Sequence, residues 1–182
     1  MPQPQNVIVC LYDCDGTLIR GDMQAPFLRT FGIDSTKFFQ ESDELMERER
    51  KENGVEIDYE NAYMLLLLDY VESGKLPPLS NSNLRDYGKL LSEIIFDGLP
   101  DYFQIIKDLV LEDHRYREHG ITLEHYIAST GLKEIILGSP LNCGGLDGVY
   151  ASEFREKNGV IAQIARAVGH QKKTQFLHMI NR

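Results

Sequence analysis

A short apolar segment that ends in two aspartates constrains the fold of this chain more than any other feature. Residues 7–12, Val-Ile-Val-Cys-Leu-Tyr, carry no charge and are rich in β-branched side chains, a pattern typical of a strand buried on both faces of a parallel sheet. Asp13 follows directly, and Asp15 stands two residues later, before Gly16 and Thr17. Because parallel sheets bind ligands beyond the carboxyl ends of their strands, the sequence predicts a site containing both carboxylates there.

The rest of the chain predicts an α/β fold with a helical insertion. Residues 22–96 show helical periodicity with polar joints and no strand pattern. The later predicted elements are, in order, a helix over 100–120, a strand over 121–128 closed by Ser129, a helix over 132–137, a strand over 148–154 and a final helix after Lys172 and Lys173. Residues 160–168 fit both a helix and an alternating strand, so this choice stays open. The order of elements predicts a doubly wound, Rossmann-like parallel sheet.

Charge and composition argue against several classes of function. Lys and Arg number 19 against 28 Asp and Glu, a formal net charge of -9, which disfavours a nucleic-acid partner and favours a small polar ligand. The apolar runs are too short for a membrane span or a signal-peptide core. Cys10, Cys14 and Cys143 show no paired spacing, which indicates free thiols in a reducing compartment. We therefore expect a cytoplasmic protein without a membrane or nucleic-acid partner.

The paired aspartates fit phosphoryl-transfer chemistry. A carboxylate held at a strand end can attack phosphorus and form an acyl phosphate, and a second carboxylate nearby can move the protons that both half-reactions need. Two adjacent carboxylates also attract Mg2+, which prefers oxygen ligands. The alternative for residues 13–17 is a polar turn closed by a side-chain hydrogen bond. For Ser129 taken alone, a helix-capping hydroxyl and a phosphate ligand are equally acceptable.

Three motifs resemble those of the haloacid dehalogenase-like (HAD) phosphatases. Residues 13–17, Asp-Cys-Asp-Gly-Thr, match the first motif after an apolar strand. Ser129, in "HYIASTG", matches the hydroxyl that closes the next strand. Lys173, in "KKTQFLHMINR", matches the lysine that opens a later helix, with Lys172 as the alternative. "GLKEIILGSP" and "GVYASEF" are more weakly similar to the phosphoserine-phosphatase-like branch, and Asp22 stands where that branch usually carries a substrate-reading glutamate.

The resemblance implies roles for these residues. Asp13 would be the nucleophile, and Asp15 the general acid and base. Asp13, with its carboxylate, and Asp15, with its backbone carbonyl, would hold Mg2+, while Thr17, Ser129 and Lys173 would bind the phosphoryl group. The resemblance also implies a core of residues 1–21 and 97–182 with a helical cap over 22–96. The function implied is a Mg2+-dependent phosphohydrolase that acts on a small phosphorylated metabolite through an aspartyl-phosphate.

The chain departs from the family pattern at its C-terminal end. The family's fourth motif supplies further aspartates after the lysine helix, but no acidic residue follows Lys173. Asp147 is the nearest substitute, although it precedes Lys173. The sheet is therefore expected to be incomplete, with the first strand at an open edge that could recruit a second copy. Either a fragment of a longer phosphatase or a natural short form would explain this, and both predict weak Mg2+ binding and slow or absent turnover. A non-catalytic phosphate-binding or interaction module is the alternative function.

Overall fold

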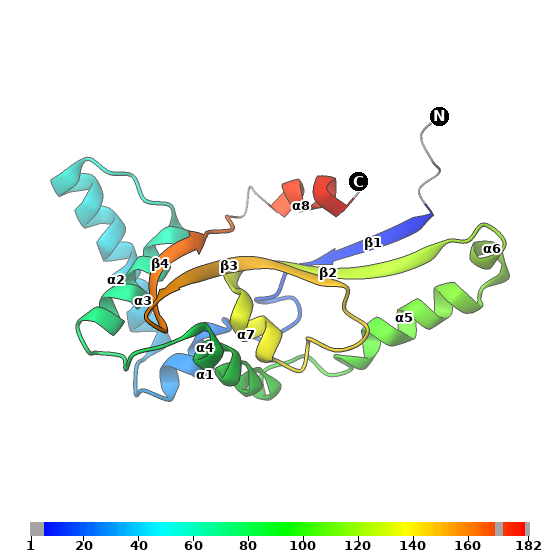
Figure 1. The fold of residues 1–182 in the computed structure, drawn as a ribbon, viewed down its shortest axis with the longest axis horizontal. Coiled ribbons are helices and arrows are strands. Elements are labelled where there is room, and N and C mark those ends of the chain that lie inside the picture. The colour runs from blue at the N-terminus through cyan, green and yellow to red at the C-terminus, as the bar shows by residue number, and fades with distance from the viewer. Residues whose placement is uncertain (1–5, 170–172, 181–182) are drawn as a thin grey trace.

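The computed structural model describes residues 6–169 and 173–180 and shows a four-stranded sheet with helices on both faces (Figure 1). In chain order the elements are β1 (Val7–Tyr12), α1 (Gln24–Arg29), α2 (Ser35–Arg48), the π-helix η1 (Glu49–Asn53), α3 (Tyr59–Glu72), α4 (Asn81–Tyr87), the 3-10 helix η2 (Gly88–Glu93), α5 (Asp101–Glu112), α6 (His114–Arg117), β2 (Thr122–Leu132), α7 (Lys133–Gly138), β3 (Gly148–Lys157), β4 (Val160–Arg166) and α8 (Lys173–Ile180). The predicted α/β class is confirmed.

The sheet has the strand order β1-β2-β3-β4. β1 pairs parallel with β2, with Tyr12 opposite Ile127, and β2 pairs parallel with β3. β4 is antiparallel to β3, which corrects the expectation of a wholly parallel sheet. It also settles the open choice within residues 160–168, where a strand runs from Val160 to Arg166. Asn158 and Gly159 both have positive φ, +54° and +77°. An Asn-Gly pair with this backbone is the preferred turn of a tight β-hairpin.

Alternating side chains of the sheet contact helices on opposite faces. Tyr12 of β1 contacts Phe103 of α5, with ring centroids 5.6 Å apart. On the other face, Tyr150 of β3 stacks on Phe176 of α8, with centroids 4.6 Å apart. Figure 1 shows α5 and α7 below the sheet and α8 above it. The prediction that β1 is buried on both faces is wrong, because Val7 and Ile8 are exposed and residues 9–12 are only half-buried.

Several predicted boundaries were wrong, and the strand predicted over 148–154 runs to Lys157. The helix predicted over 100–120 ends at Glu112, because Asp113 adopts an extended backbone and its side chain accepts a hydrogen bond from the Arg115 N–H at the start of α6. The second strand runs to Leu132 instead of ending at Ala128, and it pairs irregularly with β3 beyond that residue. Ser129 therefore lies inside β2 and does not cap a helix.

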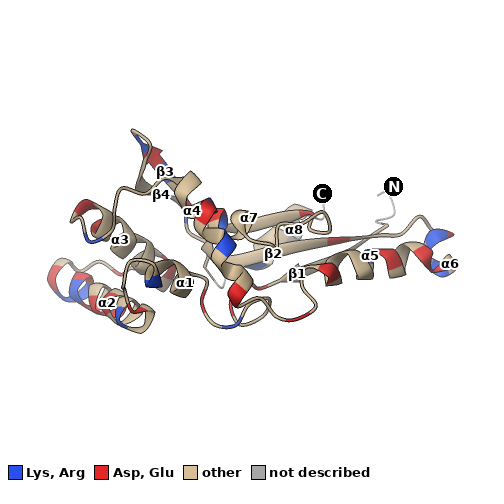
Figure 2. Cartoon of the chain, turned by 90° about the horizontal axis from the view of Figure 1, so that it is seen from below, with Lys and Arg blue, Asp and Glu red and all other residues tan. Residues whose placement is uncertain are grey.

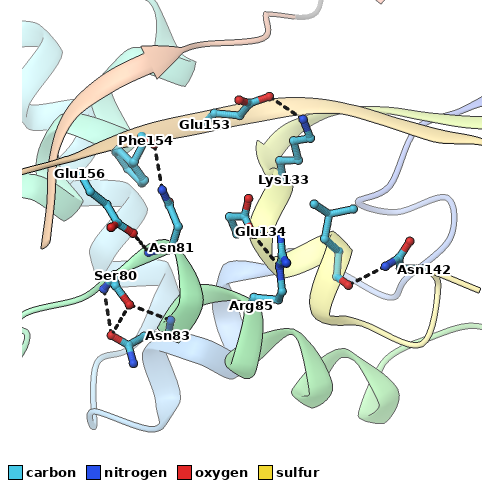
Figure 3. A network of polar contacts seen from close by, with 11 residues as sticks. Ser80, Asn81, Asn83, Arg85, Lys133, Glu134, Asn142, Glu153, Phe154 and Glu156 are labelled. Atoms are coloured by element: carbon cyan, nitrogen blue, oxygen red, sulfur yellow. Dashed lines mark hydrogen bonds and ion pairs between the residues drawn. The ribbon is translucent and has the colours of Figure 1, made fainter. Parts of the chain in front are cut away.

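Polar contacts attach the helical segment 22–96 to the sheet (Figure 3). The Asn81 side chain donates to the Phe154 carbonyl of β3 over 3.1 Å. Arg85 of α4 pairs with Glu134 of α7 over 2.7 Å. Ser80 caps α4, because its side chain accepts a hydrogen bond from the Asn83 N–H. The segment contains helices and no strand among its described residues, as expected, while its division from residues 1–21 and 97–182 as a cap stays a prediction.

Close backbone contact between α7 and α4 requires glycine at position 138. A Cβ atom there would lie 1.7 Å from the Arg85 carbonyl oxygen and 2.6 Å from its carbon. We expect Gly138→Ala to lower the free energy of unfolding by on the order of 3 kcal/mol, because backbone atoms must move apart. Gly144→Ala is the control, since nothing lies within 4 Å of its Cβ position. Urea unfolding curves measure both, and equal midpoints would contradict the packing described.

β1 occupies one edge of the described sheet. Val7 and Ile8 on this strand are 43% and 37% exposed. Association of two copies through this edge stays a prediction. Charged residues lie along the outer surfaces of α2 and α5 (Figure 2). Within the ranges that the structure describes, no helix combines the length and apolar character needed to cross a bilayer.

Candidate active site

The loop after β1 brings Asp13 and Asp15 to the carboxyl end of the sheet. The Cys14 carbonyl accepts hydrogen bonds from the N–H groups of Thr17, Leu18 and Ile19 at 2.8–3.2 Å, which closes a compact turn. The Cys14 side chain is fully buried beneath this turn. The turn therefore anchors the loop in the core and leaves both carboxylates facing the site, as the sequence predicts.

Asp15 is held by the backbone on the far side of the loop. Its Oδ1 accepts a hydrogen bond from the Met23 N–H over 3.0 Å. Met23 is buried, and its sulfur lies 3.2 Å from the Leu132 N–H. A Cβ at Gly131 would lie 2.3 Å from the Met23 methyl carbon. The packing of Met23 against the end of β2 thus positions the Asp15 carboxyl.

Burial raises the pKa of Asp15 from 3.8 to about 7. The Met23 N–H opposes this increase by stabilising the charged form, whereas the nearby carboxylates of Asp22 and Asp13 add to it. Lys173 lowers the pKa of Asp15 by a smaller amount. A carboxyl group with this pKa can both donate and accept a proton near neutral pH, as general acid and base catalysis requires.

Lys173, at the start of α8, contacts Asp13, the candidate nucleophile. Its Nζ lies 2.7 Å from Asp13 Oδ1, and the two side chains are 18% and 39% exposed. Lys173 is the first residue of α8, which Phe176 holds against Tyr150. The structure therefore brings Lys173 to the site predicted for it, while the alternative Lys172 lies outside the described residues.

A cavity of about 240 Å³ opens beside the two aspartates. Its lining comprises Asp13, Asp15, Asp22, Gln24, Phe39, Tyr59, Tyr63 and Thr130. The Tyr63 hydroxyl donates to the Thr130 carbonyl over 2.8 Å, which joins α3 to the end of β2. Tyr63 is only 2% exposed and packs in the core, and it also lines the cavity. Segment 22–96 therefore supplies most of the lining opposite Asp13.

Two predicted phosphate ligands do not line this cavity. Thr17 is exposed and is not among the residues that line the cavity. Ser129 is fully buried, and its Oγ accepts a hydrogen bond from the Gly131 N–H over 3.0 Å. The expectation for both side chains is therefore not met in this conformation, and Thr130 stands at the cavity instead, because successive residues of a strand point to opposite sides. The alternation of side chains along a strand is the sequence signal that could have identified Thr130 as a cavity residue.

The donor set fits Mg2+ only in part. The Asp13 carboxylate and the backbone carbonyl of Asp15 offer hard oxygen ligands, and Mg2+ is commonly held by one or two carboxylates together with substrate phosphates and water. No group of three or more His, Cys, Asp or Glu side chains suited to a metal occurs within residues 6–169 and 173–180. Asp147 does not complete the site, because its Oδ2 lies 2.7 Å from Lys107 Nζ and accepts a hydrogen bond from the His125 N–H.

Comparison with known proteins identifies the fold. No family model matches the sequence. The chain resembles a HAD family hydrolase of Salmonella enterica serovar Typhi with a TM-score of 0.59 and 17% identity, covering 98% of this chain and 52% of that one. The chain has the HAD-like fold. The chain spans about half the length of the Salmonella hydrolase.

Structures of phosphoserine phosphatases and related proteins are also similar to this chain. A structure described as a phospho-aspartyl intermediate analogue of phosphoserine phosphatase matches with a TM-score of 0.57 and 16% identity, over 98% of this chain and 71% of that chain. A phosphoserine phosphohydrolase-like protein of Francisella tularensis matches with a TM-score of 0.52 and 17% identity, over 96% and 74% of the two chains. An uncharacterized protein of Borreliella burgdorferi is 28% identical over 198 aligned positions, which cover all of this chain and 67% of that protein. The HAD-like, phosphoserine-phosphatase-like fold predicted from the motifs is confirmed.

Proposed function

We propose that this chain carries the catalytic centre of a Mg2+-dependent phosphohydrolase that acts on a small phosphorylated metabolite. The observation that carries the proposal is the pairing of two different carboxyl groups in one cavity. Asp13 lies 2.7 Å from the Lys173 ammonium group, whereas burial raises the pKa of Asp15 to about 7. Carboxyl groups whose environments differ in this way can divide the nucleophile and proton-transfer roles.

In the first step, a carboxylate oxygen of Asp13 forms a bond to phosphorus as the bond from phosphorus to the ester oxygen breaks. The departing oxygen takes the proton of the Asp15 carboxyl group and leaves as an alcohol. A water molecule then gives a proton to the Asp15 carboxylate and attacks phosphorus, which releases phosphate and restores Asp13. The aspartyl-phosphate would be the intermediate between these steps.

Lys173 would stabilise negative charge on the transferring group, because its ammonium nitrogen already lies beside the attacking carboxylate. The Asp13 carboxylate and the backbone carbonyl of Asp15 would hold Mg2+, which neutralises phosphoryl charge when bound. The cavity of about 240 Å³ supports a small substrate. Thr17 and Ser129 remain proposed phosphate ligands that would need a local change of conformation to reach the cavity.

We place this activity in the cytoplasm. The support is the state of the cysteines, since Cys10, Cys14 and Cys143 are all free thiols in the structure. Free thiols are the rule in a reducing compartment. Burial also raises the pKa of the Cys14 thiol, which makes this cysteine, next to the catalytic carboxylates, a poor nucleophile.

Hydrolysis of p-nitrophenyl phosphate by the 182-residue chain tests the proposed function. We expect a slow rate that rises with Mg2+ concentration and falls to background when EDTA removes the metal, because two carboxylates alone bind Mg2+ weakly. The aspartyl-phosphate is tested separately by 19F NMR with beryllofluoride, which mimics a phosphoryl group bound to a carboxylate. Absence of both turnover and a beryllofluoride adduct at saturating Mg2+ would favour a non-catalytic binding module.

A further inference from the structure

One side of the molecule presents a strand edge and an apolar helix flank next to each other. Among the described residues, β1 pairs with β2 and with no other strand, so one of its edges faces outward. Residues 7–12 contain neither a charged residue nor a proline, the residue types that commonly protect an exposed edge from pairing. The sheet therefore ends in a strand that can accept a further strand.

The flank of α5 on the same side is apolar and is called here the α5 stripe. It consists of Tyr102, Ile105, Ile106 and Leu109, at the three- and four-residue spacing that places side chains on one helix face. Its Ile105 and Leu109 side chains are 54% and 58% exposed. Tyr102 contacts Tyr12 of β1, with ring centroids 6.3 Å apart. The other flank of α5 faces β3, because Lys107 pairs there with Asp147 in the loop before that strand.

α5 runs beneath β1 and β2 in the opposite direction to both strands. The Phe103 ring, near the start of α5, lies 5.6 Å from Tyr12 at the end of β1 and 5.2 Å from His125 of β2. At its other end, Leu111 shares a groove with Leu123 at the start of β2. The α5 stripe therefore extends along the open edge of β1.

We propose that a second copy of this chain binds at this side, with the two β1 strands antiparallel about a two-fold axis normal to the sheet. Strands related in this way belong to one continuous sheet, and both α5 helices then lie on the same face of it. Neighbouring strands are about 4.8 Å apart, so two helices seated beneath β1 and β2 would lie about 10 Å from each other. This is the usual distance between packed helices, and the two α5 stripes would face each other.

A second copy matches both surfaces at once. A peptide strand added to the edge would leave the α5 stripe exposed, and a helix bound to the stripe would leave the edge unpaired. A two-fold interface joins each surface to its own duplicate, so the second copy supplies a strand edge and an apolar helix flank in the same relative positions. The chain has a formal net charge of -9, whereas β1 and the α5 stripe carry no charge. Like-charged copies can therefore meet on this side without placing charges in contact.

The extent of the two surfaces predicts a reversible dimer. β1 is six residues long, and the α5 stripe covers about two turns of helix, so the interface is small beside those of permanent dimers. Main-chain hydrogen bonds between the paired strands add affinity that does not depend on apolar area. We expect the monomer and the dimer to exchange over the micromolar range of protein concentration.

Sedimentation velocity of the full chain over this concentration range tests the proposal. Leu109→Glu should weaken dimerisation by about tenfold or more, because each dimer would bring two carboxylates into an apolar contact. Leu111→Glu is the matched control. Leu111 is 61% exposed on the same helix, but it lies on the other flank, beside Leu123. Both substitutions replace an exposed leucine, and circular dichroism checks that each variant is folded.

Hydrogen exchange locates the contact. Amides of residues 7–12 should exchange more slowly at high than at low protein concentration, because the outward groups of β1 become hydrogen-bonded in the dimer. This dependence on concentration should disappear in Leu109→Glu and persist in Leu111→Glu. Neither the β1 edge nor the α5 stripe lines the cavity beside Asp13, so the inference does not depend on the proposed phosphohydrolase activity.

Three results would overturn the proposal. A chain that stays monomeric at every concentration would leave this side to a different occupant. A dimer that survives Leu109→Glu, or that protects no amide of β1, would use another surface. Assemblies larger than a dimer would also contradict it, because a two-fold interface closes on itself. A dimer that Leu109→Glu dissociates and Leu111→Glu leaves intact, with protection of β1, is the expected result.

Discussion

Asp13→Asn is expected to lower Mg2+-dependent turnover of p-nitrophenyl phosphate by a factor on the order of 1000 or more, the scale seen when an enzyme loses its nucleophile. The amide has almost the same volume as the carboxylate but is a very poor nucleophile toward phosphorus. The Asp13 side chain is 39% exposed and its carboxylate contacts Lys173, so the substitution creates no cavity in the core. Stopped assays with and without EDTA measure the loss.

Asp147→Asn is the matched control for this prediction. It also removes one carboxylate, but one that pairs with Lys107 and the His125 N–H outside the cavity. We expect its turnover to stay within a few-fold of the parent chain. Comparable turnover in Asp13→Asn and the parent chain would remove Asp13 from the mechanism. In that case the beryllofluoride adduct should also persist in the Asp13→Asn variant.

Asp15→Asn is expected to have opposite effects on activity and on stability. Activity should fall on the order of 100-fold or more, because the amide cannot protonate the leaving group or accept a proton from water. Stability of the metal-free chain above neutral pH should rise, because the parent chain must then bury a charged carboxylate. The amide oxygen can still accept the hydrogen bond that Met23 N–H donates to Asp15 Oδ1 in the structure.

The sign of the stability effect follows from the pKa of Asp15. The carboxyl group has a pKa of about 7 in the folded chain and an ordinary value of 3.8. The folded state therefore holds the proton more tightly, and its contribution to the free energy of unfolding is lost as the pH rises from about 4 to about 7. Relative to Asp15→Asn, the parent chain should lose on the order of 3 kcal/mol across this range.

Urea unfolding in EDTA at several pH values measures this difference. Subtracting the parent curve from the Asp15→Asn curve cancels the titration of groups that both proteins share. A difference that does not change with pH would mean that Asp15 does not titrate near neutrality. A loss of activity without a gain in stability would indicate that the substitution disturbs the loop after β1 instead of removing a proton carrier.

The site combines features that the sequence predicts with features that it does not. The turn over residues 13–17 depends on hydrogen bonds to the neighbouring Cys14 carbonyl, so local sequence contains the necessary information. The cavity lining supplied by the helical segment depends on Phe39 of α2 and Tyr59 at the start of α3, which join Asp22 at the cavity only after the helices pack. Residues of this kind have no motif spacing, and their apolar character alone is compatible with a place in the core.

The sequence by itself determined β1 with its bounds, the position of the two carboxylates after it and the helical character of segment 22–96, because each depends on side-chain periodicity or on hydrogen bonds between near neighbours. Only the tertiary structure decided that Lys173 contacts Asp13, that Thr130 rather than Ser129 stands at the cavity, and that β4 returns antiparallel beside β3. Contact between residues distant in the chain depends on how whole elements pack and on strand register. A shift of strand register by one residue moves a side chain to the other face of the sheet. The motif alone therefore could not select the residue that lines the cavity.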